Sequence, residues 1–232
     1  MQTLRKNCLF IMEGALTFFP TLTFVGEAIG LRLFFRHSSA CSIAVAAICV
    51  LCALLSMDHK ATPTLPRRIA ANLLCPLAAL CWLAFLLRGM TLAVLVSMGI
   101  CLICSVLLCG YCNAGRGKLW GMALGILIAI PLCLFSGLML IFRDFGRDTV
   151  VRTVPSPDGR HYVQVIDSDQ GALGGDTLVD VHTVPILDFG MFYMAQTPQR
   201  VLIDDWGAWN SMDIFWLDED TLVINGKQYS ID

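Results

Sequence analysis

The stretch "SGLMLIFRDFGRDTVVRTVPSPDGRHYVQV", residues 136–165, joins two different kinds of sequence. Up to Phe142 the chain is almost entirely apolar, and beyond it the residues are polar, charged and broken by a Pro-Asp-Gly turn. The whole chain is 56% hydrophobic and only 15% charged, whereas an ordinary soluble domain carries about 25% charged residues. The stretch therefore predicts a boundary between a membrane part and a β-structured part.

Charge and cysteine content separate at the same boundary. Residues 1–142 hold ten Lys and Arg against three acids, a balance of +7, and residues 143–232 hold six against fifteen, a balance of −9. All eleven cysteines lie between Cys8 and Cys133. A C-terminal part without cysteine needs no disulfide, so its composition fits either side of a membrane.

Apolar runs of about 18 or more residues can cross the hydrocarbon layer as helices. We predict five such spans, at about residues 9–30, 38–57, 69–87, 90–112 and 119–142. The first run contains Glu13, Pro20 and Glu27, which leaves two alternatives for it. It is either a spanning helix or a segment broken at Pro20 and packed inside the bundle.

The positive charges predict the orientation of a five-span chain, because Lys and Arg concentrate on the cytoplasmic side. Seven fall on the side of the N-terminus, and only Arg32, Arg36 and Arg88 fall between the spans on the other side. We therefore expect a multi-pass protein of the cell membrane with a cytoplasmic N-terminus and an extracytoplasmic C-terminal part. If the first run did not span, the same rule would give conflicting signals.

Glu13 and Glu27 are the ionisable residues of the first run. They are 14 residues apart, about 21 Å along a helix axis, and would share a face. Ionisable groups at membrane depth often mark a proton or substrate pathway. The same spacing also places each carboxylate near one edge of the hydrocarbon, where water would solvate it.

Two patterns of small residues occur in the last two spans. Gly117, Gly121 and Gly125 recur every four residues, a spacing that lets two helices approach closely in lipid, either within the bundle or between two copies. "CLICSVLLCGYC" (101–112) contains Cys-x-x-Cys pairs. Without a nearby His or Asp, this spacing favours packing along a helix face over a metal site, so we predict no metal.

Beyond Thr149 the apolar residues alternate with polar ones, the period of β-strands. Asp158-Gly159 and Asn225-Gly226 occupy turns, and Asn-Gly between two alternating runs predicts a two-residue hairpin. About six short strands result. We expect a linker with the first strand at 143–154 and an antiparallel sheet or sandwich at 155–232. The fold class is thus a membrane α-helical bundle of about five helices followed by a small all-β domain.

Two blocks of the C-terminal part resemble a known family. "SPDGRHYVQVIDSDQGALGGDTLVDV" and "IFWLDEDTLVINGKQYSI" are similar to the first and last blocks of the bacterial family catalogued as domain of unknown function 5412. The resemblance covers about residues 155–231, a third of the chain, and "PILDFGMFYMAQTP" (185–198) departs from it. It implies a membrane anchor carrying a short β domain, without implying an activity.

Asp167, Asp169 and Asp176 flank a Gly-rich loop and could contribute oxygen ligands to a cation. Their spacing does not match an EF-hand loop, and Asp residues in turns more often hydrogen-bond to their own backbone. No serine of the C-terminal part lies in a nucleophile-elbow motif, and no catalytic triad is recognisable. We therefore predict neither an enzyme nor a cofactor.

The sequence favours a binding, sensor or accessory role over chemistry. The expected partners are the lipid bilayer and another membrane or envelope protein, and no nucleic acid is expected. The alternative is a small transporter or channel component that uses Glu13 and Glu27. The aromatic segments 189–194 and 206–209 would form either sandwich core or a contact patch.

Overall fold

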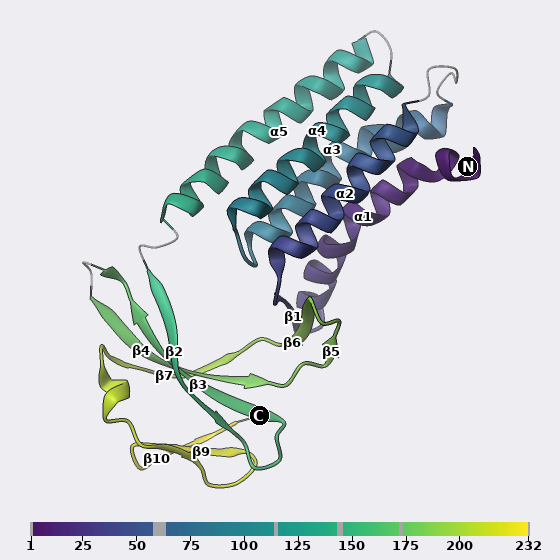
Figure 1. The fold of residues 1–232 in the computed structure, drawn as a ribbon. Helices are drawn as coiled ribbons and strands as arrows, with labels where there is room; N and C mark the ends of the chain where they lie inside the picture. The colour runs from purple at the N-terminus through teal and green to yellow at the C-terminus, as the bar shows by residue number, and fades with distance from the viewer. Residues whose placement is uncertain (1, 58–63, 114–115, 143–145, 172–173, 232) are drawn as a thin grey trace. The chain divides into compact units, whose positions relative to one another are not determined.

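A computed structural model describes residues 2–57, 64–113, 116–142, 146–171 and 174–231. Five long helices are followed by antiparallel sheets (Figure 1), which confirms the predicted fold class. The chain forms two compact units. The helical unit comprises Met1–Ile29, Leu33–Leu140 and Gly190–Phe192, and the β unit comprises Gly30–Arg32, Ile141–Phe189 and Tyr193–Asp232.

Each helix covers one of the five predicted spans, and the largest difference is at α1, which begins at Gln2 instead of at about residue 9. They are α1 (Gln2–Ala28), α2 (Ser38–Ser56), α3 (Leu65–Leu86), α4 (Leu92–Cys112) and α5 (Arg116–Ile141). Each contains a stretch of 19 to 24 residues that is long and apolar enough to cross a membrane. These lengths and compositions identify a membrane protein.

Helix α1 runs without a break through Pro20. Proline interrupts one backbone hydrogen bond and bends a helix, but neighbouring helices can compensate inside a membrane. The apolar stretch Asn7–Ala28 has 22 residues. Of the two alternatives for the first run, the continuous helix is therefore the one that the structure supports.

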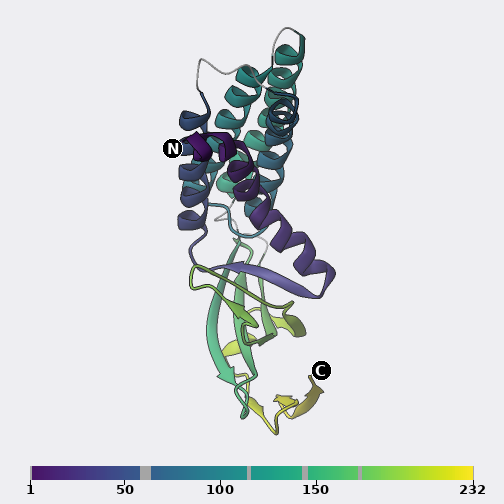
Figure 2. The same ribbon diagram turned by 90° about the vertical axis from the view of Figure 1, so that its right-hand side faces the viewer.

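Helices α1 to α4 enclose the core of the helical unit, with α1 packed on α2 and α3, and α4 packed on α2 and α3 (Figure 2). The core combines a few large side chains, such as Trp82, Phe85 and Met98, with many small ones. Ten of the eleven cysteines are buried, including all four of the 101–112 segment. Here cysteine fills space as a small apolar residue.

Helix α5 contacts this core along a narrow ridge. A Cβ atom added to Gly121 would lie 2.3 Å from Cys109 Sγ, and one added to Gly125 would lie 2.4 Å from Val106 Cγ2. Trp82 Nε1 also donates to Ser136 Oγ at 2.9 Å, and both side chains are buried. Gly121 and Gly125 thus serve packing against α4 of the same chain, whereas the side-chain surroundings of Gly117 lie outside what the structure describes.

The β unit is built on a four-stranded antiparallel sheet of order β2-β3-β4-β7 and a three-stranded sheet of order β10-β9-β8. Alternate valines of β3 and β4 pack against Met212, Ile214, Leu222, Ile224 and Ile231. Two sheets thus share one apolar core, as expected of a small sandwich. The strands are β2 (Arg147–Pro155), β3 (His161–Asp169), β4 (Gly175–Thr183), β7 (Gln199–Asp205), β8 (Ile214–Trp216), β9 (Thr221–Ile224) and β10 (Lys227–Ser230).

Both predicted turns have the expected geometry. Ile224 pairs with Lys227 across Asn225 and Gly226, whose φ angles are 50° and 79°. Positive φ at both positions is the mark of a type I′ hairpin, which is confirmed. In the other turn Gly159 has a φ of 71°, and Asp158 Oδ1 accepts hydrogen bonds from Ser156 Oγ and the Arg160 backbone N–H.

Three short strands were not predicted: β1 (Leu31–Phe35), β5 (Leu187–Asp188) and β6 (Phe192–Gln196). They form a separate sheet of order β1-β6-β5. β1 lies directly between two long apolar runs, which hide its alternation, and β5 is only two residues long. The predicted division after residue 142 lies close to the one after Leu140. In addition, Gly30–Arg32 belongs to the β unit and Gly190–Phe192 belongs to the helical unit.

Candidate functional site

Glu27 forms an ion pair at the end of α1. Its Oε1 accepts a hydrogen bond from Nη2 of Arg88, which follows α3. The Arg88 side chain is only 5% exposed, whereas that of Glu27 is 55% exposed. Among the described residues, Arg88 Nε and Thr23 Oγ1, one helical turn before Glu27, are buried without a hydrogen-bond partner. Glu27 and Arg88 thus form a polar cluster at one end of the helical unit, with Thr23 one helical turn away on the same face of α1.

Glu13 is not part of this cluster. It is partly buried on α1, where its backbone carbonyl accepts a hydrogen bond from Thr17 Oγ1 at 2.9 Å. Because α1 is continuous, Glu13 and Glu27 stay about 21 Å apart along the axis. Neither residue lines any of the four grooves found on the helical unit. The structure does not bring the two carboxylates into one cavity.

Replacing Glu27 by Gln should destabilise the helical unit by about 1 kcal/mol, because the buried Arg88 guanidinium would lose its anionic partner. Thermal unfolding of the purified full-length protein in detergent would measure this change. Glu13→Gln is the matched control, since Glu13 lies on the same helix outside the cluster, and should melt like the unmodified protein. Equal melting of both variants would show that the ion pair does not hold α1 to α3.

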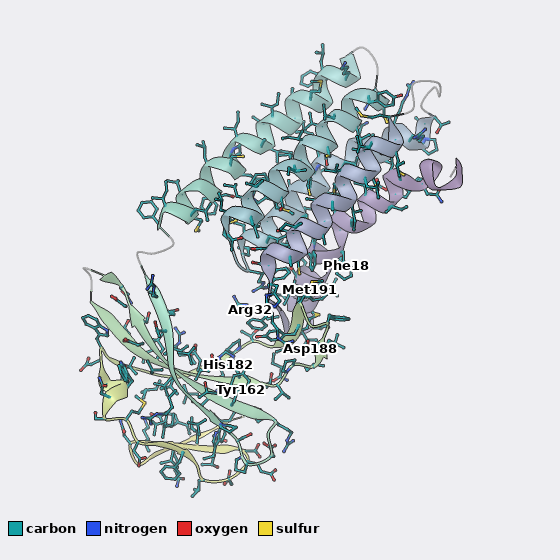
Figure 3. All side chains as sticks on the ribbon, viewed as in Figure 1. Phe18, Arg32, Tyr162, His182, Asp188 and Met191 are labelled. Atoms are coloured by element: carbon teal, nitrogen blue, oxygen red, sulfur yellow. The ribbon has the colours of Figure 1, made fainter. Side chains whose placement is uncertain are left out.

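Tyr162 and His182 form the main polar aromatic contact of the β unit. They face each other across β3 and β4, with ring centroids 5.0 Å apart and planes inclined by 9° (Figure 3). His182 Nε2 is buried and has no hydrogen-bond partner among the described residues. Two residues earlier on β4, the buried Asp180 carboxylate accepts hydrogen bonds from Arg200 Nε and Nη2 at 2.8 and 2.9 Å.

The environment of this face favours uncharged rings. Burial lowers the pKa of His182, although the nearby Asp180 carboxylate acts in the opposite direction. Burial also raises the pKa of Tyr162, as does the proximity of Tyr193. A neutral imidazole beside a neutral phenol can exchange hydrogen bonds with a bound group. No serine or cysteine side chain is hydrogen-bonded to either ring in the described part of the chain.

The depressed pKa of His182 predicts that the β unit loses stability in mild acid. A folded-state pKa below the ordinary value of about 6.5 means that the unfolded chain binds the proton more readily. Above about pH 6.5, neutral His182 therefore makes its full contribution to the free energy of unfolding of the β unit. This contribution is lost as the pH falls through the folded-state pKa. Thermal melts between pH 7.5 and 5 would measure it, and His182→Phe should flatten the profile. A profile unchanged by this substitution would assign the acid sensitivity to another group.

The three aspartates of the predicted cation site have other partners. Asp167 Oδ1 accepts from Trp206 Nε1 at 3.1 Å, Asp169 Oδ1 from the Gly171 N–H at 2.8 Å, and Asp176 Oδ2 from Gln170 Nε2 at 2.9 Å. No group of three or more His, Cys, Asp or Glu able to hold a metal occurs among the described residues. These bonds explain the aspartates as loop-stabilising residues, and the cation site stays a prediction.

The outer face of the small sheet exposes apolar side chains beside an acidic turn. Phe215 and Leu217 are 43% and 57% exposed. Phe215 lies between the core-facing residues Ile214 and Trp216 on β8, so it points away from the sandwich core, and Leu217 directly follows the strand. The turn Asp218–Asp220 follows directly. A hydrogen bond from the Thr221 side chain lowers the pKa of Asp218, and Glu219 pairs with Arg160 at 3.1 Å. We call Phe215, Leu217 and Asp218–Asp220 the β8 surface.

Five membrane-length helices and a two-sheet sandwich define an integral membrane protein with a globular β unit. Comparisons with protein-family models, with curated proteins and with solved structures find no match to this chain. The resemblance of residues 155–231 to domain of unknown function 5412 therefore stays a prediction.

Proposed function

We propose that this protein is a membrane-embedded binding or accessory protein whose β unit recognises another membrane or envelope protein. The β8 surface is the observation that carries the proposal. Apolar side chains exposed beside charged ones are typical of binding surfaces, with the apolar residues as anchors and the charges as a rim. The packed core beneath this sheet, which includes Ile214, Leu222 and Ile224, supplies the rigid support that such a surface needs.

The charge of the β8 surface defines the chemistry of the partner. Three consecutive acidic residues lie at its border, and residues 143–232 carry a net charge of −9. A complementary partner would place an apolar side chain between Phe215 and Leu217 and basic side chains against the acidic turn. Exposed charge pairs of this kind weaken with ionic strength, so the binding should weaken in high salt.

A site-specific photocrosslinker tests this surface in native membranes. Placed at Leu217 of the full-length protein, it should give one defined adduct, whereas the same group at Ile203, which is 60% exposed on β7, should not. The double variant Phe215→Ser and Leu217→Ser should abolish co-purification of the cross-linked protein, while Ile203→Ser should retain it. Identical adducts at both positions, or co-purification that survives the double variant, would disprove the assignment.

The proposal includes an extracytoplasmic β unit, which the distribution of Lys and Arg supports. The last cysteine of the chain is Cys133 in α5, so the β unit contains none. A single Ser211→Cys substitution therefore gives the β unit a unique thiol. A membrane-impermeant maleimide should label this variant in intact cells. The unmodified protein provides the background, because ten of its cysteines are buried and Cys133 lies within the span of α5. Labelling that appears only after lysis would place the β unit in the cytoplasm.

The alternative function, a small transporter or channel component, would need Glu13 and Glu27 along one water-filled route. Glu27 is instead paired with Arg88, and the four grooves of the helical unit are lined almost entirely by apolar side chains. No observation favours transport over the binding role.

A further inference from the structure

A narrow groove runs between α1 and α2 on the helical unit. It encloses about 400 Å³, and it owes its depth to the small residues Gly14, Ala15 and Ala44. Ile11 and Phe19 line its length on α1, a distance of about 12 Å along the helix. Because both helices are long and apolar enough to span a membrane, the groove opens toward hydrocarbon.

A segment from far along the chain closes one end of this groove. Met191 and Phe192 belong to the helical unit and line the groove together with Phe18. The Phe192 ring packs edge-on against the rings of Phe18 and Phe19, at centroid distances of 6.0 and 5.3 Å. Phe18 and Met191 are labelled in Figure 3. The other three grooves are lined by helices alone.

Arg36 lies beside the closed end of the groove. The backbone N–H groups of Arg36 and His37 donate to the Met191 carbonyl oxygen at 3.0 and 3.1 Å, and Arg36 Nη1 donates to the Gly190 carbonyl oxygen at 3.4 Å. Arg36 is exposed. A guanidinium has five N–H donors, so it can contact a backbone carbonyl and a phosphate together. The groove therefore combines an apolar lining with the Arg36 guanidinium beside its closed end.

We propose that this groove binds one phospholipid of the surrounding bilayer, with an acyl chain between α1 and α2 and an anionic phosphate headgroup at Arg36. The apolar lining matches the chain, and Arg36 matches the phosphate in charge and in hydrogen-bonding geometry. The inference concerns the helical unit and does not depend on the partner proposed for the β unit.

Gly14 allows a direct test of the acyl-chain part. A Cβ atom added there meets nothing within 4 Å, so Gly14→Leu would fill the groove without displacing protein atoms. Gly99→Leu is the matched control, since Gly99 lies in the α4–α5 groove and is equally open. Ala44→Leu fills the proposed site from the α2 side and serves as a second variant, and Arg36→Gln removes the headgroup contact.

Full-length protein in detergent would be mixed with phosphatidylglycerol or phosphatidylcholine, and bound lipid would be measured by native mass spectrometry. Gly14→Leu and Ala44→Leu should each reduce retention of both lipids about tenfold, because several methylene groups lose their site. Arg36→Gln should reduce phosphatidylglycerol retention about fivefold and leave phosphatidylcholine nearly unchanged. Gly99→Leu should bind both lipids as the unmodified protein does.

Circular dichroism of each variant would first establish that its helix content is retained. Equal loss of lipid in Gly99→Leu and Gly14→Leu would overturn the acyl-chain site, as would full retention in both Gly14→Leu and Ala44→Leu. Equal retention of phosphatidylglycerol in Arg36→Gln and the unmodified protein would overturn the headgroup assignment.

Discussion

Gly125→Leu is expected to lower the free energy of unfolding of the helical unit by about 3 kcal/mol. A Cβ atom at this position would lie 2.4 Å from Cγ2 of Val106, a β-branched residue on α4 with little rotamer freedom. Helix propensity alone predicts the opposite sign, because leucine is a better helix former than glycine. The yield of monodisperse protein and its melting temperature in detergent would measure the effect.

The same substitution at Gly137 provides the control. Gly137 also lies in α5, but an added Cβ meets nothing within 4 Å, so Gly137→Leu should melt at or above the temperature of the unmodified protein. Gly121→Leu should behave like Gly125→Leu, since its Cβ would lie 2.3 Å from Cys109 Sγ. If Gly125→Leu and Gly137→Leu had the same melting temperature, the result would disprove the close packing of Gly125 against Val106 of α4.

Gly175→Val is expected to destabilise the β unit by a similar amount, about 3 kcal/mol. Gly175 begins β4, where an added Cβ would lie 2.5 Å from the Ser168 carbonyl oxygen and 2.8 Å from Cδ1 of Trp206. The carbonyl belongs to the backbone of the paired strand β3 and cannot move aside without disrupting the sheet. Valine has a higher β-propensity than glycine, so propensity alone would predict that Gly175→Val stabilises the β unit.

Gly146→Val tests whether the steric contact is the cause. An added Cβ at Gly146 would approach no atom closer than the Asp169 carbonyl oxygen at 3.7 Å, which is ordinary contact. This variant should therefore unfold like the unmodified full-length protein. Replacing Trp206 by Ala in the Gly175→Val background should recover only part of the loss, because the clash with the Ser168 carbonyl persists. Complete recovery would assign the whole effect to the indole.

Local patterns in the sequence predict most of the architecture. The span lengths, the alternation in β3 and β4, and the Asn225-Gly226 hairpin all depend on neighbouring residues, so periodicity and turn chemistry were enough to predict them. The candidate sites were less predictable. Glu27 was recognised as an intramembrane candidate, but its partner Arg88 lies 61 residues away, and no spacing rule links the two.

A membrane helical bundle followed by a β domain can be read from the residues alone, because hydrophobic runs and strand alternation are local properties. Which groups meet depends on the packed fold. It directs Gly121 and Gly125 toward α4 of the same chain, stacks Tyr162 on His182, and places Met191 and Phe192 at the end of the α1–α2 groove. Such contacts join residues far apart along the chain and depend on how whole helices and strands pack, so they emerge only when the elements assemble.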